Sequence, residues 1–227
     1  VPNLPAAGFE YTTDQLYWLI AVPGLSGAAM RIGYTFMVPI FGGRNWTVIS
    51  SLLLLIPAIG LAWAVSNPDT SFATMLFVAS LAGLGGGNFA SSMVNISFFY
   101  PQSEKGKALG INAAGGNLGT GIIQLVVPFI ITTGAGVALN RAGLIFIPAA
   151  ILSALAAYFV MHNLSNAHSD LKSYAFAIKN RHTWILSFLY IGTFGSFIGY
   201  SAAMPLLIKL NFWRQPIPAI PGIGINF

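Results

Sequence analysis

One arginine differs from the other charged residues of the chain in its surroundings. Arg31 lies inside a long apolar stretch, whereas every Asp, Glu and His lies in a polar segment or at the edge of an apolar one. If that stretch crosses a membrane, an arginine at its middle costs at least about 2.5 to 3.5 kcal/mol, and such residues usually serve a function. Because no carboxylate is placed to neutralise Arg31, the sequence predicts an anionic ligand as its counter-charge.

The guanidinium group narrows the class of anion. Its planar fork of donors matches two oxygens of an oxyanion at once. Two other interpretations stay open: the side chain of Arg31 reaches toward a membrane interface, or it pairs with an acid outside this chain. The apolar stretches also lack the Asp, Glu or His relay that proton-driven transporters usually carry, and anion exchange needs no such relay.

Small residues and asparagines alternate in two of the apolar stretches. The glycine pairs at positions 83 and 87 and at positions 115 and 119 are each four residues apart, which predicts close contact between helices. Asn88 and Asn117 lie beside these glycines, where an amide can bind a ligand or only a neighbouring helix. Tyr190 and Phe194 share one face of the last stretch, either in a binding site or in an interfacial aromatic belt.

Composition sets the class of protein in which these residues act. Of 227 residues, 56% are hydrophobic and 7% are charged, whereas about a quarter of the residues in soluble domains are charged. This excludes an ordinary soluble enzyme, a disordered chain and a nucleic-acid binder, and it predicts an all-α, polytopic helical membrane protein. The absence of Cys excludes disulfides and thiolate chemistry. We expect no cofactor, no metal and no enzymatic activity.

Six candidate spans position the residues named above. A membrane helix needs about 20 mainly apolar residues, and such windows cover residues 16–40, 46–65, 72–99, 106–132, 142–161 and 184–210. We therefore expect one membrane domain over residues 1–210 and a separate C-terminal tail over residues 211–227.

The basic residues outside the spans are divided unevenly between the two sides. One set of connections contains six of them: Arg44, Lys105, Lys107, Lys172, Lys179 and Arg181. The other set, with both termini, contains three: Arg141, Lys209 and Arg214. The positive-inside rule predicts that the first set is cytoplasmic. Both termini would then lie outside, which suits a fragment that lacks its first span.

Four strings in the sequence are specific enough to indicate a family: RIGYTFMVPIFGGRNW from position 31, NFASSMVNISFFYP from 88, ALGIN from 108 and LYIGTFGSFIG from 189. They closely resemble the NarK-type nitrate/nitrite transporters, which are members of the nitrate/nitrite porter family of the major facilitator superfamily. The resemblance covers about residues 8–209 and corresponds to family spans two to seven. It implies a partial major facilitator fold and alternating access around a midplane site.

The resemblance also implies roles for individual residues. Arg31 would be the anion-binding arginine of the N-terminal half, Asn117 a polar ligand, and Tyr190 a hydroxyl donor, while Phe89 and Phe194 would form aromatic walls. The sequence departs from the family in three respects, which limit how far these roles can be carried over. The family's first span and everything after span seven are absent, and the connection after the first span lacks the usual Asp. The tail no longer resembles the family, and its closely spaced Pro residues cannot continue a helix.

The resemblance therefore implies a multi-pass protein of a bacterial inner membrane that exchanges nitrate and nitrite. Its expected partners are these small anions and the lipid bilayer, with no nucleic acid, and the full-length transporter is expected to be a monomer. Proton-coupled nitrate uptake is one alternative. The other is a truncated membrane fragment that transports nothing.

Overall fold

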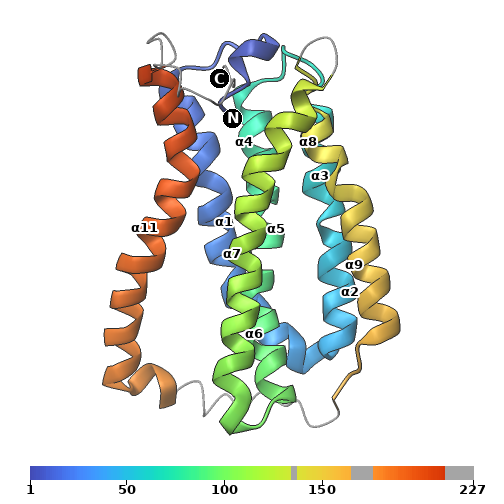
Figure 1. The fold of residues 1–227 in the computed structure, drawn as a ribbon, viewed down its shortest axis with the longest axis vertical. Helices are drawn as coiled ribbons and strands as arrows, with labels where there is room; N and C mark the ends of the chain where they lie inside the picture. Colours follow the sequence, from blue (N-terminus) through green and yellow to red (C-terminus); the bar gives the residue numbers. More distant parts are fainter. Residues whose placement is uncertain (134–136, 165–175, 213–227) are drawn as a thin grey trace, which may run out of the picture.

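Long helices run back and forth between the two ends of the molecule (Figure 1). The computed structural model describes residues 1–133, 137–164 and 176–212, and this part of the chain is helical without strands. It contains six helical stretches that are long and apolar enough to cross a membrane: Thr13–Phe41, Gly43–Ala64, Phe72–Phe99, Gln102–Thr132, Arg141–Val160 and Arg181–Asn211. The prediction of an all-α, polytopic membrane fold is confirmed.

Three of the six stretches consist of consecutive helices that are interrupted by single residues. In chain order the helices are α1 (Thr13–Phe41), α2 (Gly43–Leu53), α3 (Leu55–Ala64), α4 (Phe72–Leu81), α5 (Gly83–Gly86), α6 (Asn88–Phe99), α7 (Gln102–Thr132), α8 (Arg141–Leu144), α9 (Phe146–Val160) and α11 (Arg181–Phe212). The interruptions at Ala82 and Gly87 lie in the third stretch, where the helical hydrogen bonding changes locally.

Some of the sequence-based expectations concern residues outside the described ranges. The separate tail predicted over residues 211–227 is described only at its first two residues, which continue α11. His168, Asp170 and Lys172, which were expected in a connection, also lie outside the described residues.

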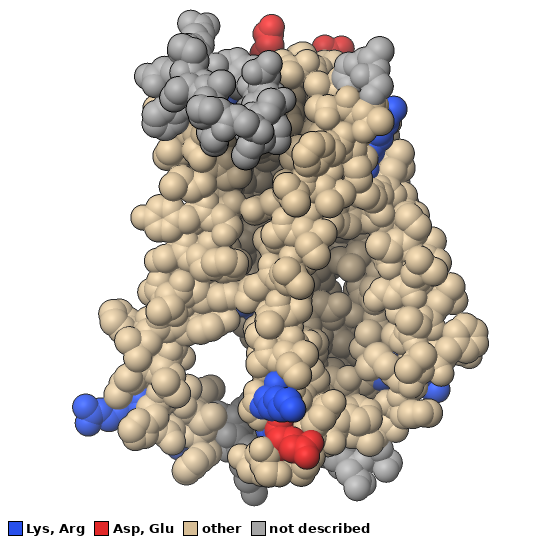
Figure 2. Space-filling view, in the orientation of Figure 1, with Lys and Arg blue, Asp and Glu red and all other residues tan. Residues whose placement is uncertain are grey.

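The charged side chains gather at the two ends of the molecule, and the face between them is almost uncharged (Figure 2). The α1–α2 and α6–α7 connections lie at one end, and the N-terminus, the α3–α4 connection and the C-terminal end of α11 lie at the other (Figure 1). This placement matches the two sets of connections sorted from the sequence. The assignment of the first set to the cytoplasm stays a prediction.

A side-chain cap joins two spans at the end with the α1–α2 connection. Asn163, just after α9, accepts hydrogen bonds from the backbone N–H groups of Arg44 at 2.9 Å and Asn45 at 3.4 Å. These groups belong to the first turn of α2 and would otherwise lack partners. Gly42 has a φ of 84°, and a Cβ there would lie 2.5 Å from Asn163 Oδ1. The cap therefore requires glycine at this turn.

The last span is attached to the others mainly at the end where the N-terminus lies. Lys209 Nζ donates to the carbonyl of Pro2 at 2.7 Å and to Asn3 Oδ1 at 3.1 Å. On α7, Gln124 Nε2 donates to the carbonyl oxygen of Ser201 at 3.0 Å. Within α11 that carbonyl would normally accept from the residue four positions on, which is Pro205 and has no N–H. Gln124 thus satisfies a carbonyl that the proline leaves free.

We predict that Gln124→Ala destabilises the chain by about 1 kcal/mol, the usual net value of one hydrogen bond. In a Pro205→Ala background the restored backbone N–H binds the Ser201 carbonyl, so Gln124→Ala should lower the free energy of unfolding by clearly less. Thermal unfolding of the four detergent-solubilised variants measures both values. An equal loss in the two backgrounds would show that the proline does not create the need for Gln124.

Candidate anion-binding site

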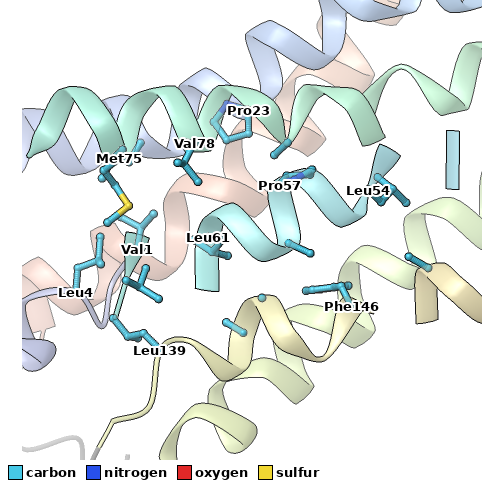
Figure 3. Close-up of a pocket in the computed structure, with 18 of the residues that line it drawn as sticks. Val1, Leu4, Pro23, Leu54, Pro57, Leu61, Met75, Val78, Leu139 and Phe146 are labelled. Carbon is cyan, nitrogen blue, oxygen red and sulfur yellow. The ribbon is translucent and has the colours of Figure 1, made fainter. Parts of the chain in front are cut away.

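One cavity of the structure is almost wholly apolar. It has a volume of about 540 Å³ and lies between α1, α3, α4, α8 and α9. Figure 3 shows side chains such as Leu61, Val78 and Phe146 pointing into it. Among the described residues that line it, Ser153 has the only polar side chain. An anion bound there would lose its hydration without gaining charged or hydrogen-bonding partners, so we do not assign the anion site to this cavity.

A second cavity has the opposite character. Its volume is about 440 Å³, and it lies between α1, α2, α5, α6, α7 and α11. Its lining residues are Arg31, Thr47, Gly85, Gly86, Asn88, Phe89, Ser91, Ser92, Asn112, Gly116, Asn117, Thr120, Phe194 and Ile198. These include one cation and several amides and hydroxyls, but no Asp, Glu or His. The lining therefore has a net positive charge that none of its own residues offsets.

Arg31 is held by a backbone carbonyl and two aromatic rings. Its Nε donates to the carbonyl oxygen of Gly86 at 3.3 Å. Its guanidinium carbon lies 5.3 Å from the ring centroid of Phe89 and 5.9 Å from that of Phe194, within the range of cation–π attraction. The terminal nitrogens of Arg31 have no hydrogen-bond partner among the described residues. They remain available to bind a ligand.

The break between α5 and α6 makes the Gly86 carbonyl available to Arg31. Beyond the break, the N–H of Ala90 bonds to the carbonyl of Gly87 at 3.1 Å, three residues back instead of the four of an α-helix. The carbonyl of Gly86 thus has no partner on α6, and the Nε–H of Arg31 takes that place. Such a discontinuity in a membrane span is tolerated where it borders a cavity.

Glycines allow α1 to reach this break. A Cβ on Gly86 would lie 2.7 Å from the Cα of Gly27, and one on Gly87 would lie 2.8 Å from the ring of Tyr34. A Cβ on Gly83 would lie 2.5 Å from the hydroxyl of Ser26. Since real Cβ atoms essentially never come this close to other atoms, side chains at these positions would push α1 away. The close approach predicted at positions 83 and 87 is confirmed.

The matching prediction for the second glycine pair is wrong. A Cβ on Gly115 or Gly119 would meet nothing within 4 Å among the described residues. The physical reason is their place on α7: Gly116 and Asn117, which lie between them, line the cavity. This part of α7 borders open space, so its small residues do not serve close packing against a described helix.

The structure brings four of the five predicted site residues to one cavity. Arg31, Phe89, Asn117 and Phe194 line it, and the rings of Phe89 and Phe194 are nearly parallel, with centroids 6.5 Å apart. Tyr190 is not among the lining residues. Its ring stacks on Phe194 with centroids 4.8 Å apart, and it is 47% exposed. Their roles in binding an anion stay predictions.

The hydroxyl groups of the cavity donate to their own helices. Each bonds to a backbone carbonyl three or four residues earlier: Thr47 to Gly43, Ser91 to Asn88, Ser92 to Phe89 and Thr120 to Gly116. Because a hydroxyl has a single proton, these four groups have no donor left for a ligand in this arrangement. The amide of Asn117, by contrast, makes no hydrogen bond within the described residues. The available donors are therefore Arg31, Asn117 and the amide nitrogen of Asn88.

Several lining residues were not predicted. Asn112, Gly116 and Thr120 are four residues apart along α7 and therefore share one face. This spacing, together with Asn117, is a signal that could have identified the whole cavity-facing side of α7. Thr47 on α2 and Ile198 on α11 had no comparable signal, because single residues of these types are common throughout membrane helices.

Comparisons with known proteins place the chain in a family. The family model described as Major Facilitator Superfamily matches residues 1–224. The chain is 45% identical over 225 residues to nitrate/nitrite transporter NarU of Salmonella typhimurium, with 92% of this chain and 49% of that protein covered. It is 40% identical over 228 residues to the probable nitrate/nitrite antiporter NarK2 of Thermus thermophilus, with 92% of this chain and 51% of that protein covered.

The chain spans about half the length of these relatives. Its six candidate spans and its similarity to proteins of bacteria show a multi-pass protein of a bacterial inner membrane.

We predict that Gly86→Ala destabilises the chain by about 1 to 3 kcal/mol, the usual cost of overpacking, because the added methyl group meets the backbone of Gly27. Gly33→Ala is the matched control, since a Cβ at Gly33 on α1 meets nothing within 4 Å. It should be neutral or slightly stabilising. Thermal unfolding in detergent compares the two variants, and equal stabilities would show that α1 does not depend on this contact.

Proposed function

Since the chain belongs to the Major Facilitator Superfamily, we propose that it forms part of a transporter that exchanges nitrate and nitrite across the membrane. The observation that carries this proposal is the state of Arg31. It lies in a cavity whose lining residues include no carboxylate, and its terminal nitrogens have no partner among the described residues. A small anion supplies both the charge and the acceptors that this group lacks.

The cavity offers a planar oxyanion both donors and walls. In nitrate, the terminal N–H groups of Arg31 bind two of the oxygens, and the amide of Asn117 donates to the third. The rings of Phe89 and Phe194 confine the ion beside Arg31. Tyr190 adds its hydroxyl only when α11 moves closer to the cavity, because in this structure its ring lies against Phe194 outside the lining.

The aromatic walls favour nitrate and nitrite over more strongly hydrated anions. An ion that enters must give up part of its hydration shell, and the apolar rings return nothing for it. Nitrate and nitrite carry a single charge and hold water weakly, so a guanidinium group and one amide can replace what they lose. Sulfate carries two charges and loses far more hydration than these donors restore.

The charge of Arg31 also gives a reason for exchange. Closing the cavity around an empty site would remove a bare cation from water, which is strongly unfavourable. A bound anion neutralises that charge, so the occupied site closes and reopens more readily than the empty one. Figure 2 shows an opening between α11 and α7 on the side of the α6–α7 connection, the side predicted to be cytoplasmic. We interpret this arrangement as the inward-facing one.

We predict that Arg31→Lys weakens nitrate binding to the purified chain about tenfold or more. A lysine keeps the charge but loses the fork, and a hydrogen bond to a charged group is worth about 1.5 to 3 kcal/mol. Isothermal titration calorimetry in detergent measures the dissociation constant. Arg44→Lys is the matched control, because Arg44 stacks on Tyr158 outside the cavity. Equal affinities for the wild-type chain and Arg31→Lys would contradict the proposed site.

The coupling mechanism makes a separate prediction. In proteoliposomes that contain the chain, uptake of labelled nitrate should require nitrite or nitrate inside and should not require a pH gradient. Uptake that needs the pH gradient and no internal anion would favour proton-coupled transport instead. Nitrate binding without uptake would show that this chain supplies a binding site and does not transport by itself.

A further inference from the structure

A short chain of hydrogen bonds joins α7 to the first turn of α6. The amide nitrogen of Asn112 donates to the hydroxyl of Ser92 at 3.0 Å. The hydroxyl of Ser92 in turn donates to the backbone carbonyl of Phe89 at 2.9 Å. Because the single proton of Ser92 goes to Phe89, its lone pairs are free to accept from Asn112. The bonds therefore run in one direction, from α7 to the residue whose ring borders the cavity.

The first turn of α6 needs such support. It begins directly after Gly87, whose backbone keeps helical dihedral angles (φ −67°, ψ −26°). Beyond Gly87 the N–H of Ala90 bonds three residues back instead of four, so the regular α-helical hydrogen bonding into this turn is locally lost. Phe89 is the second residue of this turn, and its ring lies 5.3 Å from the guanidinium carbon of Arg31. Whatever holds this turn against α7 also sets the position of the ring beside Arg31.

Asn112 faces the cavity but is not available as a ligand. Its amide nitrogen also lies 3.5 Å from the sulfur of Met93, so both of its N–H groups can be directed at α6. Asn117, five residues further along the same helix, has an amide without a hydrogen-bond partner in the described part of the chain. Two asparagines of one helix thus line one cavity in different hydrogen-bonding states.

We propose that Asn112 is a positioning residue: acting through Ser92, it holds the first turn of α6 so that the Phe89 ring stays beside Arg31. This inference rests on the proposed function, since the ring's position is expected to affect binding of nitrate. It assigns Asn112 and Ser92 to the shape of the site and Asn117 to contact with the anion.

The test measures nitrate binding by calorimetry for Asn112→Leu, which keeps the side-chain volume and removes the donors, and for Ser92→Ala. Each should weaken binding about three- to tenfold, as expected for loss of one hydrogen bond. The double variant should be no weaker than the worse single one, because both changes break the same chain of bonds. Thr132→Ala on α7, whose hydroxyl bonds only within that helix and outside the cavity, should leave the affinity unchanged.

A Phe89→Leu background separates positioning from general loss of structure. Without the ring, Asn112→Leu has nothing to misplace and should not weaken nitrate binding further. The proposal would be overturned if Asn112→Leu weakened nitrate binding as much in the Phe89→Leu background as in the wild type. It would also be overturned if the effects of Asn112→Leu and Ser92→Ala on the affinity multiplied, or if both single variants kept the wild-type affinity.

A second measurement does not depend on nitrate. Para-fluorophenylalanine placed at position 89 reports the surroundings of the ring by fluorine NMR. Asn112→Leu and Ser92→Ala should move its resonance in the same direction, and Thr132→Ala should not. If the wild-type protein binds no nitrate but the resonance moves as expected, the proposed function fails and the positioning role of Asn112 is supported. If nitrate binds and the resonance does not move in these variants, the positioning role of Asn112 is contradicted and the proposed function is not.

Discussion

The charge of Arg31 is the constraint on which the rest of the site depends. A guanidinium group inside an apolar helix bundle needs partners, and its cavity provides no carboxylate. The structure meets part of that need with one carbonyl and two aromatic rings. These contacts fix the direction of the side chain without neutralising its charge, because a carbonyl dipole and a ring quadrupole carry no net charge. Under the proposed function, a bound anion supplies the negative charge that these contacts do not provide.

The partial pairing of the Arg31 guanidinium group depends on a backbone carbonyl that a regular helix would not leave free. The carbonyl that binds Arg31 belongs to Gly86, and it is free because α5 and α6 do not form one continuous helix. Arg31 reaches it because Gly27 and Gly86 bring the two backbones close together, with no room for a Cβ. The glycines, the break and the arginine are therefore one arrangement. Each would be unfavourable alone, since glycine weakens a helix and an isolated cation in a membrane is costly.

The sequence predicted the fold well because bilayer thickness imposes a length and a composition that single windows can detect. It also singled out Arg31, which lines the cavity, because a charged residue within an apolar stretch is an exception; the role of Arg31 in binding an anion stays a prediction. It was less successful with glycines: positions 83 and 87 contact α1, but positions 115 and 119 face open space although their spacing is identical. Spacing defines a face of a helix, and only the arrangement of the neighbouring helices decides what that face meets. Thr47 was missed because a single threonine is common throughout membrane helices and gives no signal of its own.

Asn112 and Asn117 show why residue type alone does not assign a role in such a cavity. Both line it, both come from α7, and both carry the same amide. Asn112 has its N–H groups directed at α6, whereas Asn117 has no hydrogen-bond partner in the described residues. In an apolar setting an unpaired donor is unfavourable until a ligand arrives, so the energy it recovers contributes to binding. An already paired donor gains nothing from a ligand and instead fixes the geometry. The proposed distinction between Asn117 as a ligand and Asn112 as a support therefore follows from which donors the protein itself leaves unpaired.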